Sequence, residues 1–149
     1  MKVLLLHQHY HSPENGGIIR SYYLTRALVA QGIRVTVITT HNQKRYLREQ
    51  MEGTEIHYLP IAYKNRFTFW ARIVSFIKYT WKASTLGSSL GSFDYCYAIS
   101  VPLTVGIAAM WIKNRLSIPY VFEVGDLWPE APIQMGVIRN SLIQKSLYA

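Results

Sequence analysis

Two adjacent glycines, Gly16 and Gly17, follow a very apolar first segment and precede an amphipathic one, within the stretch 12–20. Glycine reaches positive φ and lets a ligand approach the backbone, and the N–H groups that begin a following helix attract anions. Arg20, one turn into that helix, would add a fork of donors for phosphate oxygens. The same residues also fit an ordinary tight turn between a strand and a helix. The G-x-G-x-x-G spacing is absent, so a standard dinucleotide site is not supported.

A second group of chemically useful side chains is acidic. Glu123 lies near the end of the apolar segment 119–124, and Asp126 and Glu130 follow that segment. A carboxylate at such a position accepts a hydroxyl proton or holds a hydroxyl-bearing ligand. Alternatively, Asp126 ahead of Pro129 is typical of the beginning of a helix. Both interpretations remain open on these residues.

Histidines alternate at His7, His9 and His11, at the end of the first apolar run. We expect no metal site, because no carboxylate or cysteine lies at ligand spacing nearby. His9 is instead expected to contact a substrate, and Ser100, after another apolar run, is expected to line the same cleft. No nucleophile elbow, P-loop or Cys-x-x-Cys pattern is present.

The apolar segments that carry these residues predict an α/β fold. Five strands are expected, with helices between them. The strands are expected at 3–8, 34–40, 54–60, 94–100 and 119–124, and helices at 18–31, 63–86 and 103–116. The polar stretch 41–53 is expected to be a mobile surface connection with no element of its own. The alternation predicts a Rossmann-like, doubly wound parallel sheet whose carboxyl edge carries the candidate residues.

The segment 63–86 is basic and aromatic, and it contains no acidic residue. Helical periodicity places Trp70, Ile73, Val74, Ile77 and Trp81 on one face, with Arg72, Lys78 and Lys82 towards the other. One interpretation packs the apolar face on the sheet and leaves the basic side in solvent. The other lays the helix on an anionic membrane. The residues expected to contact the membrane are then Arg66, Trp70, Arg72, Lys78, Trp81 and Lys82.

Composition narrows the protein class. The 149 residues fit a single domain, and 16 Lys and Arg against 8 Asp and Glu give a formal charge of +8, which favours anionic partners. We expect no nucleic-acid partner, because no binding module is recognisable. The single Cys96 favours a cytoplasmic location, and the basic helix would add peripheral association with the inner face of the membrane. The segment 141–149 begins a helix without ending it, so we expect a fragment truncated before a further domain.

The first strand with 12–17 and Arg20, together with the segment 122–130 (Phe-Glu-Val-Gly-Asp-Leu-Trp-Pro-Glu), resembles the N-terminal domain of family-4 glycosyltransferases of the GT-B fold. The resemblance implies that 1–149 is the acceptor-side half of an enzyme acting in surface-polysaccharide synthesis. Its missing C-terminal domain would bind the nucleotide sugar. Many relatives carry His, or in some subgroups Arg, where this chain has Gly125.

The resemblance also implies roles for individual residues. Gly16 and Gly17, helped by Arg20, would approach the donor diphosphate. Because Gly125 departs from the family's pattern, the resemblance implies no standard catalytic residue at that position, and we expect the neighbouring Asp126 to be the catalytic residue. The acceptor, a saccharide that is expected to be lipid-linked, would be contacted by His9, Glu14, Asn15, Ser100, Glu123 and Glu130. No cofactor or metal is expected, because the nucleotide sugar is a substrate. The fragment alone would be inactive.

Two other functions remain open. In the first, the chain is a noncatalytic subunit that docks a separate catalytic chain at the membrane and binds the acceptor. A nucleotide-binding regulatory domain is the third interpretation.

Overall fold

The computed structural model describes residues 1–16, 19–64 and 66–125. Its centre is a six-stranded sheet in the order β3-β4-β2-β1-β5-β6, in which every neighbouring pair is parallel except β3 and β4. The strands are β1 (Lys2–Leu6), β2 (Arg34–His41), β3 (Leu47–Met51), β4 (Thr54–Pro60), β5 (Tyr95–Ile99) and β6 (Tyr120–Glu123).

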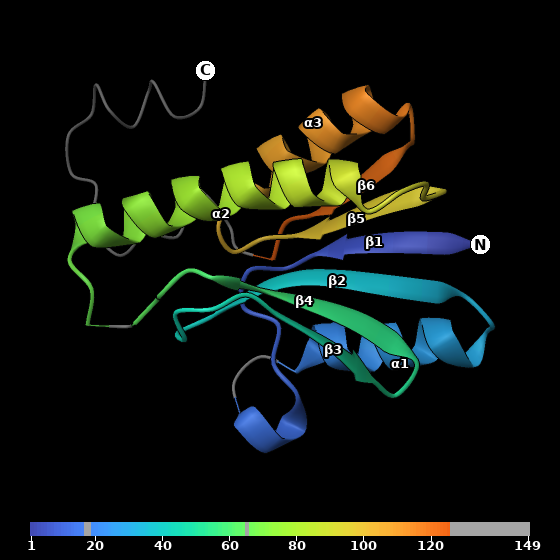
Figure 1. Ribbon diagram of the computed structural model, residues 1–149, viewed down its shortest axis with the longest axis horizontal. Helices are drawn as coiled ribbons and strands as arrows, with labels where there is room; N and C mark the ends of the chain where they lie inside the picture. Colours follow the sequence, from blue (N-terminus) through green and yellow to red (C-terminus); the bar gives the residue numbers. More distant parts are fainter. Residues whose placement is uncertain (17–18, 65, 126–149) are drawn as a thin grey trace.

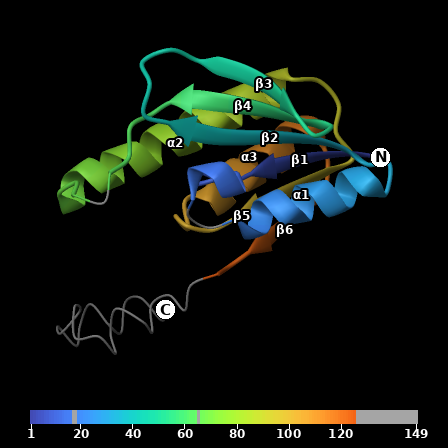
Figure 2. The ribbon, with the colours of Figure 1, turned by 90° about the horizontal axis from the view of Figure 1, so that it is seen from below.

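Helices cover both faces of this sheet, as Figures 1 and 2 show. One face carries α1 (Arg20–Ala30), and the other carries α2 (Phe69–Ser89) and α3 (Val105–Leu116), which pack against each other. A short 3-10 helix, η1 (Pro13–Asn15), precedes α1. The predicted doubly wound α/β fold is therefore confirmed.

Alternate strand residues feed two separate cores, because successive side chains of a strand point to opposite faces. Leu4 and Leu6 of β1 lie in the cluster under α2 and α3, whereas Leu5 lies in the cluster under α1. All three side chains are fully buried. This explains the unbroken apolar run of β1, since a strand covered on both faces has no polar side.

The expectation of a mobile connection over 41–53 is wrong for its second half. Residues Leu47–Met51 form β3, which pairs antiparallel with β4 from Leu47↔Tyr58 to Met51↔Thr54. This edge strand is almost wholly exposed and carries Arg48 and Glu49, so it lacks the apolar alternation of a half-buried strand. Charged residues on an edge strand also oppose pairing with another chain.

Of the two interpretations of α2, the one that packs its apolar face on the sheet is wrong. The side that packs on the sheet and on α3 presents small residues and one tyrosine, and the apolar stripe points outward. The buried residues are Ser75, Tyr79, Ala83, Ser84 and Gly87. A Cβ on Gly87 would lie 2.7 Å from Ile112 Cδ1 and 3.0 Å from Leu4 Cδ2, so this contact needs a residue without a side chain. The tyrosine hydroxyl donates to the carbonyl oxygen of Ile38 at 2.7 Å.

Helix α2 begins beyond the carboxyl edge of the sheet and runs back across it (Figure 1). Thr68 caps this end by accepting a hydrogen bond from the amide of Ala71 at 3.4 Å. The first turns of α2 therefore extend past the ends of β1 and β2, on the side of the sheet where ligands bind in open α/β folds. Within the described part of the chain, no helix combines the length and the apolar character needed to cross a bilayer.

Candidate functional site

A cavity of about 210 Å³ lies at the carboxyl edge of the sheet. His7 follows β1, Ser100 follows β5, Glu123 ends β6 and Arg20 begins α1, and all four residues line it. The neighbours β1 and β5 lead into crossovers on opposite faces of the sheet, so the cavity lies at the topological switch point where open α/β folds bind ligands.

Glu123 is the centre of the hydrogen bonds in this cavity. Arg20 Nη1 donates to its Oε1, and the hydroxyl of Tyr97 donates to its Oε2 at 2.6 Å. The bond to Glu123 is the main cause that raises the pKa of Tyr97 above its usual value. Two donors thus fix the orientation of this carboxylate.

Ser100 joins the ends of β5 and β6. Its backbone amide donates to the carbonyl oxygen of Glu123 at 2.9 Å, and its Oγ accepts from the amide of Gly125 at 2.9 Å. Because Ser100 is buried, its hydroxyl is a fixed part of the cavity wall. The predicted grouping of Arg20, Ser100 and Glu123 at one edge is what the structure shows.

His7 forms the buried floor of the cavity, with 2% of its surface exposed. Its Nδ1 is 2.8 Å from Ser21 Oγ. Burial, followed by the nearby His9 and His11, lowers the pKa of His7 to about 4, although the Glu123 carboxylate opposes this shift. The imidazole is therefore neutral near pH 7, and its two ring nitrogens can donate one hydrogen bond and accept another without carrying charge.

The other histidines do not share this position. Strand β1 ends at Leu6, so His7, His9 and His11 do not lie on one continuous strand. The ring of His9 packs instead against Tyr63, with centroids 4.5 Å apart, and burial followed by His11 lowers its pKa to about 4. His9 does not line the cavity. Among the residues that the structure describes, no group of three His, Cys, Asp or Glu side chains could hold a metal ion.

The glycine loop is described only in part. Gly16 has φ +67°, a conformation that favours glycine, and its amide donates to the carbonyl oxygen of Pro13 at 3.4 Å. Glu14 and Asn15 belong to η1, and neither Glu14 nor Gly16 lines the cavity. Gly17, Asp126 and Glu130 lie outside the described residues.

Sequence reasoning missed three residues of the site: His7, Ser21 and Tyr97. His7 was considered only as a member of the histidine run, although its place directly after a buried strand was the informative signal. Tyr97 lies within β5, two positions before Ile99, and Ile99 is the register partner of Glu123. Residues two positions apart in a strand point to the same face, so Tyr97 lies on the same face of the sheet as Glu123. This relationship can be recognised only once β5 and β6 are known to pair.

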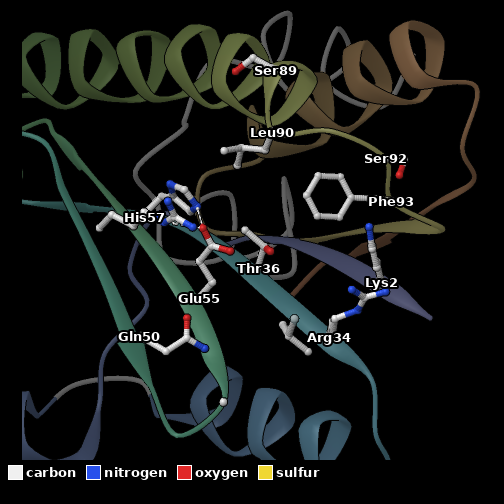
Figure 3. Close-up of a pocket in the computed structure, with 13 residues that line it drawn as sticks. Lys2, Arg34, Thr36, Gln50, Glu55, His57, Ser89, Leu90, Ser92 and Phe93 are labelled. Carbon is white, nitrogen blue, oxygen red and sulfur yellow. Dashed lines mark hydrogen bonds and ion pairs between the residues drawn. The ribbon is translucent and has the colours of Figure 1, made fainter.

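A larger hollow, of about 490 Å³, opens at the amino edge of the sheet (Figure 3). Lys2 and Arg34, which are register partners on β1 and β2, line it together with Arg48. Glu55 pairs with Arg48 at 2.6 Å and with His57 at 2.9 Å. We place the functional site at the carboxyl edge despite the smaller volume there, because ligands of parallel sheets bind beyond the carboxyl ends of the strands.

The outward stripe of α2 and the outward side of α3 expose large apolar residues. On α2, the exposed fraction is 73% for Trp70 and 75% for Trp81, and Val74 and Ile77 lie between them. On α3, the exposed residues are Ile107, Met110 and Trp111. We call these seven side chains the α2–α3 apolar face. Exposed apolar side chains that gather on neighbouring helices mark a candidate interaction surface.

Cations accompany this face. Lys78 and Lys82 are exposed on α2, as are Ile77 and Trp81, which precede them in the sequence. Arg66 is exposed before the helix, and Arg72, which is less exposed, donates from Nε to the carbonyl oxygen of Phe67 at 3.2 Å. In the sequence from 61 to 122, Asp94 is the only acidic residue.

Solved structures with the same fold are known. Two crystal structures of the C-terminal domain of the PF1911 hydrogenase from Pyrococcus furiosus superimpose with a TM-score of 0.58 each. They are 15% and 12% identical to this chain, and each comparison covers 82% of this chain and 90% of the other. At this identity the likeness shows the fold alone. No curated protein matches the sequence.

The sequence itself gives the family. The family model of the glycosyl transferase 4-like domain matches residues 15–148, a range that includes Arg20, Ser100 and Glu123 of the cavity as well as α2 and α3. The match agrees with the doubly wound sheet and with the resemblance of the glycine loop and the 122–130 segment. The chain belongs to the glycosyl transferase 4-like domain family.

Proposed function

We propose that the protein transfers a sugar from a nucleotide sugar to a hydroxyl group of a saccharide acceptor, and that this chain supplies the acceptor side of the site. The observation that carries the proposal is the convergence of Glu123, Arg20, His7 and Ser100, from four separate elements, on one cavity at the switch point of the sheet. Its polar groups suit an acceptor hydroxyl, and the family supplies the class of reaction.

In this proposal, Glu123 receives the acceptor hydroxyl. Its carboxylate is held by Arg20 and Tyr97, so it offers an oriented acceptor of hydrogen bonds. Neutral His7 lines the same cavity and orients the sugar through a hydrogen bond without adding charge. Asp126 directly follows Gly125, whose amide bonds Ser100, and we propose it as the catalytic residue.

The leaving nucleoside diphosphate gains charge during transfer, so positioned donors stabilise the transition state. We propose that Gly16 and Gly17 bring backbone amides to the diphosphate, which a second domain holds from the other side of the cleft. Arg20 has five N–H donors in a planar fork. It can therefore keep its bond to Glu123 and still offer other donors to phosphate oxygens.

We further propose that the α2–α3 apolar face rests on an anionic membrane surface and that the acceptor is lipid-linked. Aromatic and aliphatic side chains insert between lipids, while Lys78, Lys82 and Arg66 meet anionic headgroups, each contributing about 1 kcal/mol. The near absence of acidic residues from 61 to 122 supports this partner. The enzyme would then work at the inner face of the cell membrane, in the synthesis of surface polysaccharides.

The transfer proposal is tested with the full-length protein and a panel of nucleotide sugars, by measuring release of nucleoside diphosphate in the presence of membrane lipid extracts. Glu123→Gln should lower acceptor-dependent release by about a hundredfold, because the amide keeps the shape but loses the charge. Glu49→Gln on the exposed strand β3 is the matched control and should retain activity. Equal activity of both variants would remove Glu123 from the site.

A further inference from the structure

A second cavity lies on the other side of Ser100 from the polar one. It has a volume of about 300 Å³ and opens between α2 and the connection from β5 to α3. Ile73 and Phe76 of α2 form one wall, and Val101, Pro102 and Leu103 form the other. This volume is at the lower end of the range, about 300–1,000 Å³, of ligand pockets in proteins.

The lining of this apolar hollow contrasts with that of the polar cavity. Among the described residues, no charged side chain lines the hollow, whereas charged Arg20 and Glu123 and neutral His7 line the cavity at the end of β6. Phe76 is stacked on Tyr63, with ring centroids 5.7 Å apart and planes 21° apart, so its wall has a fixed shape. A preformed apolar hollow of this kind takes hydrocarbon rather than sugar or phosphate.

The two cavities share a wall. Ser100 and Val101 line both of them, so one backbone segment separates the polar site from the apolar hollow. On its other side, the hollow adjoins the α2–α3 apolar face, because Ile73 lies next to exposed Val74 on α2 and Leu103 precedes α3. The order across the surface is therefore polar cavity, apolar hollow and apolar face.

We infer that the apolar hollow holds the first carbons of the hydrocarbon chain of an amphiphilic acceptor whose saccharide occupies the polar cavity. This inference rests on the proposed transferase function for the saccharide end. The apolar hollow is a binding site for the lipid end, and it lies between the membrane face and the reacting hydroxyl.

The experiment measures binding of butyl, hexyl and octyl phosphate, each below its micellar concentration, to the full-length protein by calorimetry, with inorganic phosphate as the probe without a chain. Burial of each methylene should tighten binding by up to about fourfold until the apolar hollow is full. Citronellyl phosphate is measured in parallel, and comparing its affinity with that of octyl phosphate distinguishes a preference for a branched isoprenoid chain from a preference for a straight chain. Affinity that does not change with chain length would overturn the inference.

Matched variants tell this hollow from the exposed face. Leu103→Trp fills the apolar hollow and should remove the dependence of affinity on chain length. Ile107→Trp lies four residues further on, on the exposed side of α3, and should retain that dependence. Leu103→Ala enlarges the hollow and should keep or strengthen binding of the branched chain. A dependence that survives Leu103→Trp in a folded variant contradicts the inference.

The outcomes also separate this inference from the proposed function. If Glu123→Gln lowers nucleoside diphosphate release but Leu103→Trp does not change alkyl phosphate binding, the lipid-site inference is wrong and the transferase proposal is retained. If Leu103→Trp abolishes the chain-length dependence of alkyl phosphate binding but no nucleotide sugar reacts, the apolar hollow is retained as a lipid site and the transferase proposal is wrong.

Discussion

Arg20 and Glu123 are 103 positions apart in the chain, and they form an ion pair at the carboxyl edge of the sheet. Arg20 begins α1 on one face, and Glu123 ends the edge strand β6. The side chain of Arg20 is 72% exposed, whereas that of Glu123 is 17% exposed, so the arginine covers the carboxylate from the solvent side. This pair links the glycine-loop side of the site with the acidic segment.

Arg20→Ala should lower kcat of the full-length enzyme by about a hundredfold, because removing a positioned donor to developing charge costs about 10²–10³ in kcat. Stability should change little, since an exposed ion pair contributes only about 0–1 kcal/mol. Steady-state kinetics and thermal unfolding measure the two effects. Arg26→Ala is the control, because Arg26 pairs with Glu52 at 3.1 Å away from the cavity. Wild-type kinetics for Arg20→Ala would exclude Arg20 from the site.

Stability should fall as the pH decreases from about 6.5 towards 4. The folded protein holds His7 and His9 neutral, with pKa values of about 4, whereas the unfolded chain protonates them near pH 6.5. The unfolded state therefore binds more protons in this window, and acid favours it. For buried His7 the full effect is on the order of 3 kcal/mol.

Urea unfolding of wild type and His7→Gln at pH 7.5 and pH 5 tests this expectation. At pH 7.5 the histidines are neutral in both states, so that measurement gives the cost of the lost contacts alone. Between the two pH values the variant should lose less stability than the wild type. Equal losses would show that His7 does not titrate as its burial requires.

Tyr79→Phe should lower the free energy of unfolding by about 1–2 kcal/mol, because it removes the buried hydrogen bond to Ile38 and leaves the ring in place. Tyr95→Phe is the control, since Tyr95 is 44% exposed and should change stability by less than about 0.5 kcal/mol. Chemical denaturation measures both. A neutral effect of Tyr79→Phe would mean that the hydroxyl contributes nothing to holding α2 on the sheet.

The α2–α3 apolar face should bind vesicles that contain anionic lipid and release them at high salt, because exposed charges are screened beyond about 10 Å at 0.1 M salt. Sedimentation of the full-length protein with vesicles measures this. Trp70→Ser with Trp81→Ser should weaken binding at every salt concentration, whereas Lys78→Gln with Lys82→Gln should reduce its salt dependence.

Tyr23→Ser is the control for the tryptophan variants, because Tyr23 is a 53% exposed aromatic residue on α1, across the sheet. Equal binding to neutral vesicles would contradict the electrostatic part of the proposal. A dimer that forms through this face in the absence of lipid would assign it to a second copy of the chain instead.

Sequence patterns predicted the strand and helix order well where the chain is buried on both sides. The unbroken apolar runs of β1 and β5, with a helical stretch after each, left few alternatives to a parallel sheet. The carboxyl-edge placement of Arg20, Ser100 and Glu123 followed from that order alone. β3 escaped prediction because an exposed edge strand is selected for charge and not for alternation.

The outward stripe of α2 shows the limit of periodicity. The spacing from Trp70 to Trp81 correctly defines one face of a helix, but it does not say what covers that face. The opposite side buries Ser75, Ala83 and Gly87, whose small side chains carry little hydrophobic signal yet allow close approach to α3 and β1. These small residues are buried because α2 packs closely on its neighbours, and this burial can be seen only in the three-dimensional structure.

The central sheet also acts as a partition. In the part of the chain that the structure describes, its two packing clusters share no residue, with Tyr79 on one side and Tyr22 on the other. Energetic effects add when sites have no common partners. Substitutions in the core under α2 and α3 and substitutions in the core under α1 should therefore have additive effects on stability, except at Ser100 and Val101, which line cavities on both sides.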